Sequence, residues 1–580
     1  MKSIFFLLLL TCGLLLEAAP FPAENSRWTA ADLDAQRAAG AGLQRELRQA
    51  LKTGKKEFRV PKGVYRFAET DPKAAAFFRF LEVKDFTFDG GGSEFYLEKL
   101  ETAVSVYKSE NVTIRNLSID YDPLPFTQGE VVSVDYSNNT FVFRPDPGYG
   151  AFCEPMFKLS LRGILFDRAD RRMKLGQTGF GLAMKRKLDN GDYLVQVRGF
   201  YNRPAQVCGF EPGDLITILG RTARAVKTEV SAGCAFENVT LYSSPFVCFV
   251  ENVGQGGHTY TNCRIVKRPG TDRLMSGNAD GFNSASVLRG PKLLNCEIDT
   301  IGDDFVNFHG VYYRVFEQLS PTELVVQSFH FYGDGPAQLS FLESKSWKAL
   351  GVRSATVGAP FTYTVPEKNS AVGRVWAAAG NFKPGQKVQA RRITLDKPLE
   401  TAAPPIFASL SAIAAGAEIR NCTFRNSLAR GIRFQSRDAV IENNLLDRAQ
   451  SPHLTTAGQP GFWGESITSA NLVIRNNTFI EGGMDGQGKT GAAIEITAPG
   501  ELAAAECVEH IRFENNKILR SGGPAILVRT ARDVQLKDNR IDGINRVAVP
   551  GRAPAKTAIV VEDSADVTEN GNRITPQEAV

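Results

Sequence analysis

Ile419-Arg-Asn421-Cys-Thr-Phe424 is one copy of a phrase that returns along this chain, and the fold can be predicted from it. The full phrase reads apolar-x-apolar-x-Asn-x-x-apolar, with the first half often degraded. It returns as Ile441-Glu-Asn443-Asn-Leu-Leu446, Ile474-Arg-Asn476-Asn-Thr-Phe479 and Phe513-Glu-Asn515-Asn-Lys-Ile518. The remaining copies end at Ile119, Leu241, Ile265, Ile298, Ile541 and, in degenerate form, Ile574.

The spacing of the copies indicates a solenoid. Measured between their last apolar residues, the copies lie 122, 24, 33, 126, 22, 33, 39, 23 and 33 residues apart. Short strands in a unit of this size are typical of a stacked parallel β-helix, in which each coil buries its inward residues on its neighbours. Asn tolerates left-handed corner geometry and can form a ladder with the Asn above it. A β-sandwich is disfavoured because hairpin turns do not separate the strands at even spacing. We predict an all-β, right-handed parallel β-helix.

Two long insertions interrupt this pattern. The spacings of 122 and 126 residues each equal one coil plus roughly 100 residues, about the size of a small domain. Both stretches contain alternating strands without the Asn phrase, such as Tyr193–Val197 and Glu323–Gln327. We predict two inserted β-barrel-like domains, at 123–230 and 311–405, with β-helix coils at 231–310 and 406–580. The insertions should flank the surface of the 231–310 coils.

The N-terminus indicates export. Residues 1–23 have a short basic start, an apolar core and small residues Ala18-Ala19, as a secretory signal peptide does. No later stretch approaches the ~20 apolar residues that span a membrane. Residues 24–122 should form a cap of one or two helices, with Leu43 and Leu47 on the buried face, followed by the first coils. We predict a periplasmic or extracellular protein.

Charge and cysteine content limit which partners and metals the protein could bind. The net charge of +5 comes from 68 basic and 63 acidic residues without a basic run, which disfavours nucleic acid as a partner. Cys263, Cys296 and Cys422 occupy one position of the repeated phrase, so we expect buried, mostly reduced thiols. No Cys/His cluster has zinc spacing. We predict no metal and no cofactor.

Three aspartates are the catalytic candidates. Asn278-Ala-Asp280-Gly281 is followed, 23 and 24 residues later, by Asp303 and Asp304. An adjacent Asp pair is most often a solvated turn, but stacked coils lie roughly 4.8 Å apart, so all three side chains can converge on one face. At least one carboxyl should then have a raised pKa. A protonated and an ionised carboxyl are the equipment of glycoside hydrolysis, whereas a calcium site for a lyase is the rival use.

These motifs resemble two glycosidase families. Asn278-Ala-Asp280-Gly281 with Gly302-Asp303-Asp304 resembles the aspartate motif of the polygalacturonases, glycoside hydrolase family 28. Over nearly the full mature length the chain looks closer to family 110, the α-1,3-galactosidases acting on blood-group-B-type glycans. That resemblance implies an inverting exo-glycosidase, with Asp303 as general acid and Asp280 with Asp304 activating the water. Inverting sites usually hold carboxyls about 6.5–9.5 Å apart, so we expect the side chains to splay.

Other residues are candidates for substrate binding. The polygalacturonase arginine-isoleucine-lysine that holds a uronate is best matched by Arg433-Phe434-Gln435, and the missing lysine favours a neutral sugar. Trp463 could stack on a sugar ring, and Glu465 could accept hydrogen bonds from its hydroxyls. The last two candidates are Arg430 and His309, the latter only five residues after Asp304.

The leading expectation is an exported enzyme whose partner is a glycan with a terminal α-galactose. A polygalacturonase-like hydrolase or lyase on uronate polysaccharide stays open, as does a glycan-binding β-helix without activity. Paired aspartates disfavour the pure binder, because it gains little from carboxylates that repel each other. The sequence leaves the oligomeric state open, a homodimer included.

Overall fold

A computed structural model of the protein describes residues 28–575, apart from 150–160, 178, 199–208, 333–334, 344–347, 367–381, 402–404, 461–462, 486–490, 499–507 and 549–552. The predicted signal peptide, 1–23, lies outside the described residues, so export stays a prediction. Within the described part, no helix is long and apolar enough to cross a membrane.

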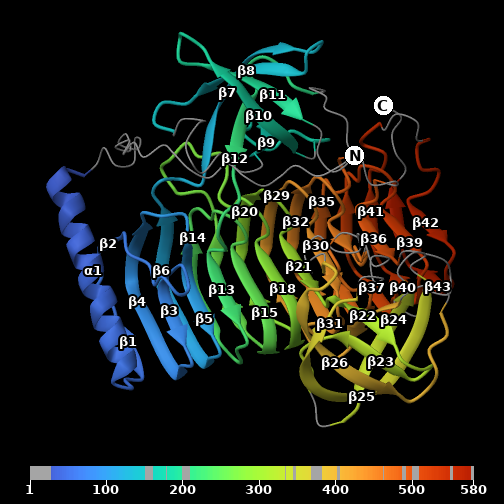
Figure 1. The fold of residues 1–580 in the computed structure, drawn as a ribbon. Coiled ribbons are helices and arrows are strands. Elements are labelled where there is room, and N and C mark those ends of the chain that lie inside the picture. Colours follow the sequence, from blue (N-terminus) through green and yellow to red (C-terminus); the bar gives the residue numbers. More distant parts are fainter. Residues whose placement is uncertain are drawn as a thin grey trace.

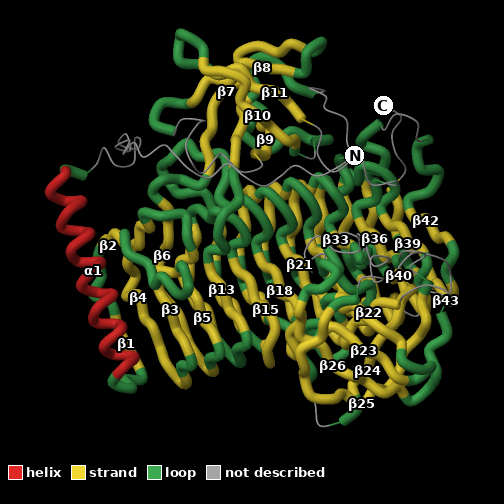
Figure 2. The backbone as a smooth tube through the Cα atoms, viewed as in Figure 1, coloured by secondary structure: helices red, strands yellow, loops and turns green. Residues whose placement is uncertain are grey.

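One helix, α1 (Ala30–Lys52), covers the first coil (Figure 2). Thr29 caps its N-terminus in a reciprocal pair of hydrogen bonds with Asp32, which satisfies two of the backbone N–H groups that a helix start leaves open. Leu43 and Leu47 are buried on the face predicted from their spacing. The helix therefore shields the open end of the sheet stack from solvent and from edge-to-edge pairing.

The body is a parallel β-helix built from two long sheets that run side by side (Figure 1). The first sheet has 21 strands: β1 (Glu57–Arg59), β2 (Val64–Phe67), β4 (Lys84–Leu97), β6 (Glu110–Tyr121), β14 (Ala235–Leu241), β16 (Thr259–Thr261), β17 (Arg264–Ile265), β19 (Lys292–Leu294), β20 (Glu297–Ile301), β28 (Glu418–Arg420), β29 (Thr423–Ser427), β31 (Arg437–Glu442), β32 (Leu445–Ala449), β34 (Ser469–Arg475), β35 (Thr478–Ile480), β37 (Val508–Glu514), β38 (Lys517–Leu519), β40 (Arg532–Lys537), β41 (Arg540–Asp542), β43 (Ala565–Asn570) and β44 (Arg573–Thr575).

The second sheet has 11 strands, in the order β3 (Ala76–Leu81), β5 (Thr102–Tyr107), β13 (Val226–Glu229), β15 (Phe249–Gly256), β18 (Phe282–Arg289), β21 (Val306–His309), β30 (Ile432–Gln435), β33 (Leu454–Thr455), β36 (Ile494–Thr497), β39 (Ile526–Arg529) and β42 (Ile559–Glu562). Its neighbours pair in parallel, for example β18 with β21. One continuous hydrophobic core runs between the sheets from the first coil to the last, so the three β-helix segments of the sequence form one body.

Two closed antiparallel barrels interrupt the β-helix (Figure 1). The first contains β7 (Phe126–Asp135), β8 (Thr140–Pro145), β9 (Leu161–Phe166), β10 (Phe180–Lys187), β11 (Tyr193–Arg198) and β12 (Leu215–Leu219). The second contains β22 (Tyr312–Gln318), β23 (Glu323–Gln327), β24 (Ala337–Glu343), β25 (Ala349–Thr364), β26 (Lys387–Leu395) and β27 (Pro405–Ser409). Each barrel has a hydrophobic core of its own. The predicted fold class is confirmed, and β27 extends beyond the second predicted insertion, 311–405.

The asparagines of the repeated phrase form the corners between strands. Backbone φ is 57° at Asn116, 56° at Asn421 and 57° at Asn476, the left-handed region that Asn tolerates better than most residues. The corner side chains also form a partial outer ladder, since Asn262 donates to Asn238 (3.1 Å). This local geometry explains why the phrase marks each coil.

A second ladder, which was not predicted, lies one residue further along and inside the coil. Asn444 donates to the side-chain oxygen of Asn477 (2.9 Å), and Asn477 donates to that of Asn516 (3.0 Å). Asn477 also donates to the carbonyl of Ile441 (2.9 Å) and is 1% exposed. Each amide therefore satisfies polar groups of two neighbouring coils inside the core.

We expect Asn477→Ala to lower the free energy of unfolding by roughly 2–4 kcal/mol, because it leaves buried partners unsatisfied. The corner variant Asn476→Ala should cost only about 1–2 kcal/mol, the cost of left-handed geometry, and Asn476→Gly should be near neutral. Thermal unfolding followed by circular dichroism measures all three. Equal losses at positions 476 and 477 would contradict the inner ladder.

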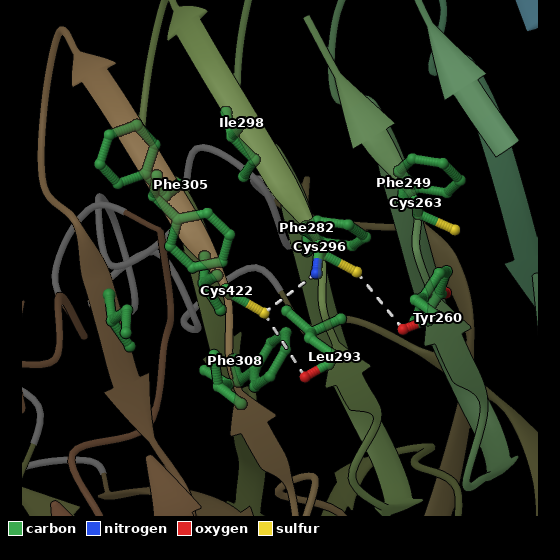
Figure 3. Packing of buried hydrophobic residues seen from close by; sticks show 14 of the residues in the cluster. Phe249, Tyr260, Cys263, Phe282, Leu293, Cys296, Ile298, Phe305, Phe308 and Cys422 are labelled. Carbon is green, nitrogen blue, oxygen red and sulfur yellow. Dashed lines mark hydrogen bonds between the residues drawn. The ribbon is translucent and has the colours of Figure 1, made fainter. Parts of the chain in front are cut away.

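Cysteines occupy this inner position in the middle coils. Cys263, Cys296 and Cys422 are buried and stacked along the core (Figure 3). The Cys296 N–H donates to the Cys422 sulfur (3.4 Å), and the Cys422 N–H donates to the Asn444 side chain (2.8 Å). The two residue types thus form one continuous column. Cys153, Cys208 and Cys507 lie outside the described residues.

We expect the stacked cysteines to titrate as free thiols only after unfolding, since burial excludes reagents. The described part of the chain holds five free cysteines, Cys234, Cys248, Cys263, Cys296 and Cys422. Titration in denaturant without reductant should find at least five thiols per chain, and titration of the folded protein should find far fewer. A thiol-free unfolded chain would contradict this prediction.

Candidate active site

Asp280, Asp303 and Asp304 lie where two neighbouring strands of the second sheet begin. Asp280 precedes β18, and the adjacent pair precedes β21. The two strands pair in parallel with Phe282 opposite Val306, which places Asp280 one coil from the pair. One oxygen from each carboxylate lies within 4.8 Å of the others. The structure thus brings together the three residues predicted to be catalytic.

Asp303 is held by two arginines from the first insertion. Arg221 Nη2 lies 2.6 Å and Arg162 Nη1 3.5 Å from Asp303 Oδ2. Burial alone would raise the pKa of this carboxyl, but the positive charges of Arg221, Arg162 and Arg430 outweigh it and lower the pKa to about 2. Asp303 is therefore ionised at neutral pH.

Asp304 forms a bidentate ion pair with Arg430. Arg430 Nε and Nη2 donate to the two carboxylate oxygens at 2.9 and 3.0 Å, and the Arg430 backbone N–H adds a bond of 2.8 Å. Asp304 is 1% exposed, and burial raises its pKa despite the arginine. Arg430, predicted to bind substrate, thus fixes a member of the triad.

Asp280 is the carboxyl most disposed to hold a proton. Burial comes first and the charges of Asp303 and Asp304 second in raising its pKa well above the ordinary value, against a hydrogen bond from Asn283 (2.9 Å). The sequence predicted at least one raised pKa in the triad, and the family resemblance implied Asp303 as the general acid. In the structure the pKa of Asp303 is lowered by its arginines, and Asp280 and Asp304 are the carboxyls whose pKa is raised.

Glu465, Arg433 and Asn307 form a second polar cluster beside the triad. Arg433 Nη2 lies 2.6 Å from Glu465 Oε2, and Asn307 donates to Glu465 Oε1 (3.2 Å). Arg433 is 1% and Glu465 4% exposed, and their neighbours at the site include the charge of Asp304. Asn307 Oδ1 and Arg433 Nε are buried and have no hydrogen-bond partner within the described part of the chain.

The remaining predicted ligands are His309 and Trp463. His309 ends β21 and is buried, with Nδ1 2.9 Å from the Gly310 carbonyl oxygen. Trp463 is 39% exposed in the turn before Glu465. This exposure leaves ring surface for a sugar, and its stacking role stays a prediction.

The main site residues that the sequence did not predict are Arg162, Arg221 and Asn307. Both arginines belong to the segment of the first barrel, far from the triad in sequence and outside the repeated phrase. Asn307 lies at an ordinary strand position three residues after Asp304. The Asp280–Asp304 spacing carries no information on residues contributed by an insertion, so these two arginines could not be found from it.

The splay of the carboxylates stays a prediction, because it concerns the separation of whole carboxyl groups. Their nearest oxygens converge to within 4.8 Å, because the arginines around them offset the repulsion of three acids. Three converging carboxylates also suit a cation, but Asp303 and Asp304 already have close arginine partners. Those positive charges disfavour a calcium ion at the same place.

Fold and site define the class of protein: a parallel β-helix with a carboxylate triad set among arginines. The protein-family model described as right handed beta helix region matches residues 409–579. Alpha-1,3-galactosidase B of Bacteroides thetaiotaomicron is 24% identical over 69% of this chain and 63% of that protein. Proteins of the same name from Phocaeicola vulgatus and Akkermansia muciniphila are each 22% identical, over 75% and 87% of this chain and 76% and 67% of their own lengths.

These relatives confirm the resemblance to the α-1,3-galactosidases, and the chain spans less than two thirds of the first of them. Among solved structures, the catalytic domain of GH87 alpha-1,3-glucanase in complex with nigerose is 10% identical, with a TM-score of 0.39, covering 92% of this chain and 64% of that one. The mannuronan C-5 epimerase AlgE4 A-module of Azotobacter vinelandii is 10% identical, with a TM-score of 0.38, covering 89% and 95%.

Proposed function

We propose that this protein is an exo-glycosidase that hydrolyses terminal α-1,3-linked galactose from blood-group-B-type or related glycans. The observation that carries the proposal is the triad, in which Asp303 is held ionised and Asp280 is disposed to hold a proton. Glycoside hydrolysis needs one carboxyl of each kind. The galactoside specificity is taken from the names of the relatives.

In the proposed reaction, the bond between galactose C1 and the glycosidic oxygen breaks while Asp280 gives its proton to that oxygen. A water molecule forms the new bond to C1, and its proton passes to Asp303. Because the transition state resembles an oxocarbenium ion, the attack of water demands little basicity of the Asp303 carboxylate. Arg430 keeps Asp304 in place beside both groups.

The charge pairing favours a neutral sugar over a uronate. Arg430 is paired with Asp304, Arg433 with Glu465, and Arg221 and Arg162 with Asp303. A uronate carboxylate would have to compete with these buried acids for the same cations. Gln435, which stands where a polygalacturonase has lysine, donates instead to the carbonyl of Ala457 (3.0 Å).

We propose inversion at C1, as the resemblance to family 110 implies. Time-resolved NMR of the first product should then show β-galactose. Retaining enzymes hold their two carboxyl groups about 5–5.5 Å apart and release the α-anomer first, so the first product distinguishes the two mechanisms. If α-galactose is the first product, the configuration at C1 is retained, and the reaction is a double displacement and not a direct one.

The substrate class is tested with a panel of linear and fucosylated α-1,3-galactosides, α-1,4- and α-1,6-galactosides and oligogalacturonates. We expect free galactose from α-1,3-linked ends only, at a rate unchanged by a chelator. Release of uronate sugars, or loss of activity with the chelator, would favour the polygalacturonase-like or the lyase alternative. Binding without turnover across the whole panel would favour a non-catalytic glycan-binding protein.

A further inference from the structure

The first barrel is fastened to the coil that carries Asp280. Asn278, two residues before Asp280 and fully buried, donates from its side-chain nitrogen to the carbonyls of Pro125 (2.8 Å) and Gly220 (2.7 Å). Pro125 immediately precedes β7, and Gly220 immediately follows β12. One side chain thus holds both connections between the barrel and the β-helix.

Two arginines extend from this attachment to the triad. Arg221 donates through Nε to the carbonyl of Asn278 (3.1 Å) and through Nη2 to the carbonyl of Gly302 (3.0 Å) and to Asp303 (2.6 Å). Arg162, on β9, donates to the carbonyl of Gly302 (3.0 Å) as well. Arg221 therefore joins both coils of the triad and the Asp303 carboxylate with one planar guanidinium, a geometry that lysine cannot reproduce.

We propose that Arg162 and Arg221 are positioning residues for the reaction, through which the first barrel completes the active site by keeping Asp303 ionised and oriented. The inference rests on the proposed function. The charged groups that face Asp303 are the cations of Arg162, Arg221 and Arg430 and the acids Asp280 and Asp304. Without the two barrel arginines, burial and two neighbouring acids would act on Asp303 against the single cation of Arg430, already paired with Asp304.

The sign of the effect on pH dependence follows from this arrangement. Asp303 has to be ionised to accept a proton from water, so its pKa sets the acid limb of the kcat/KM profile. Removing a cation raises that pKa. Arg221→Met should therefore move the acid limb to higher pH by at least about one unit and lower kcat on the plateau on the order of 10-fold.

The control is Arg168→Met, which removes an exposed arginine of the same barrel that pairs with Glu130 (2.7 Å). It should leave the profile unchanged. Arg162→Met should shift the acid limb in the same direction but less, in keeping with its longer distance of 3.5 Å, and Arg221→Lys should restore part of the shift. An acid limb that stays in place in both methionine variants would overturn the proposal.

A second measurement does not depend on activity. The thermal midpoint is compared for the wild type, Arg221→Met, Asp303→Asn and the double variant at pH 7. If Arg221 acts on the charge of Asp303, the loss caused by Arg221→Met should shrink in the Asp303→Asn background. Additive losses would refute the coupling. A coupled pair in a protein that hydrolyses no α-galactoside would instead refute the proposed function alone.

Discussion

Replacing Asp280, Asp303 or Asp304 by asparagine should each lower kcat on an α-1,3-linked galactobiose by at least about 100-fold, and by up to ~10⁴-fold. Asparagine keeps the shape of the side chain but can neither give the proton nor carry the charge. Asp304→Asn also removes the partner of half-buried Arg430, so part of its loss should come from a displaced site. Steady-state kinetics with released galactose quantified measures all three.

A matched control separates these losses from damage to the coil. Asp299 lies on β20, four residues before Asp303, where its side chain binds Lys267 and Asn426 and no member of the triad. Asp299→Asn should keep kcat within about twofold, since surface ion pairs contribute little. Circular dichroism should show that all four variants fold. If the triad variants retain turnover while binding the glycan normally, a carboxylate mechanism is wrong.

The coil architecture could be predicted because it is encoded locally. Each corner needs a residue that tolerates left-handed geometry, and Asn421 and Asn476 supply it at positions that recur with the coil. The inner ladder was missed because Cys422 and Asn444 fill the same position with different chemistry. One packs as a small apolar residue and the other as a buried hydrogen-bonding one, and only the stacked coils reveal that they are equivalent.

For the site, too, the sequence predicts what the repeat encodes and misses what comes from elsewhere in the chain. Asp280 and Asp304 are one coil apart, so their convergence follows from the repeat, whereas Arg162 and Arg221 arrive through the docking of a barrel. No period in the sequence encodes that docking. The lowered pKa of Asp303 has the same origin, because the pKa of a carboxyl depends on neighbours that tertiary structure supplies. The direction of the pKa shift at Asp303 could not be predicted without knowing that Arg162 and Arg221 lie beside it.

A substrate with a better leaving group should restore much of the activity that Asp280→Asn, the variant of the proposed proton donor, loses. An aryl α-galactoside departs with little protonation, so Asp280→Asn should lose far less kcat/KM on it than on the disaccharide, while Asp303→Asn should lose about equally on both. The basic limb of the wild-type pH profile, which reports deprotonation of Asp280, should also disappear in Asp280→Asn. The acid limb should stay below the ordinary aspartate pKa of 3.8, because Asp303 is ionised down to about 2.

The opposite pattern is equally informative. Rescue of Asp303→Asn in place of Asp280→Asn would return the donor role to Asp303, the assignment that the family resemblance implied. It would require that bound substrate displaces Arg221 from Asp303, because a carboxylate held 2.6 Å from a guanidinium is a poor acid. The Arg221→Met variant would then gain, not lose, activity at neutral pH, and the two experiments together would assign the proton without ambiguity.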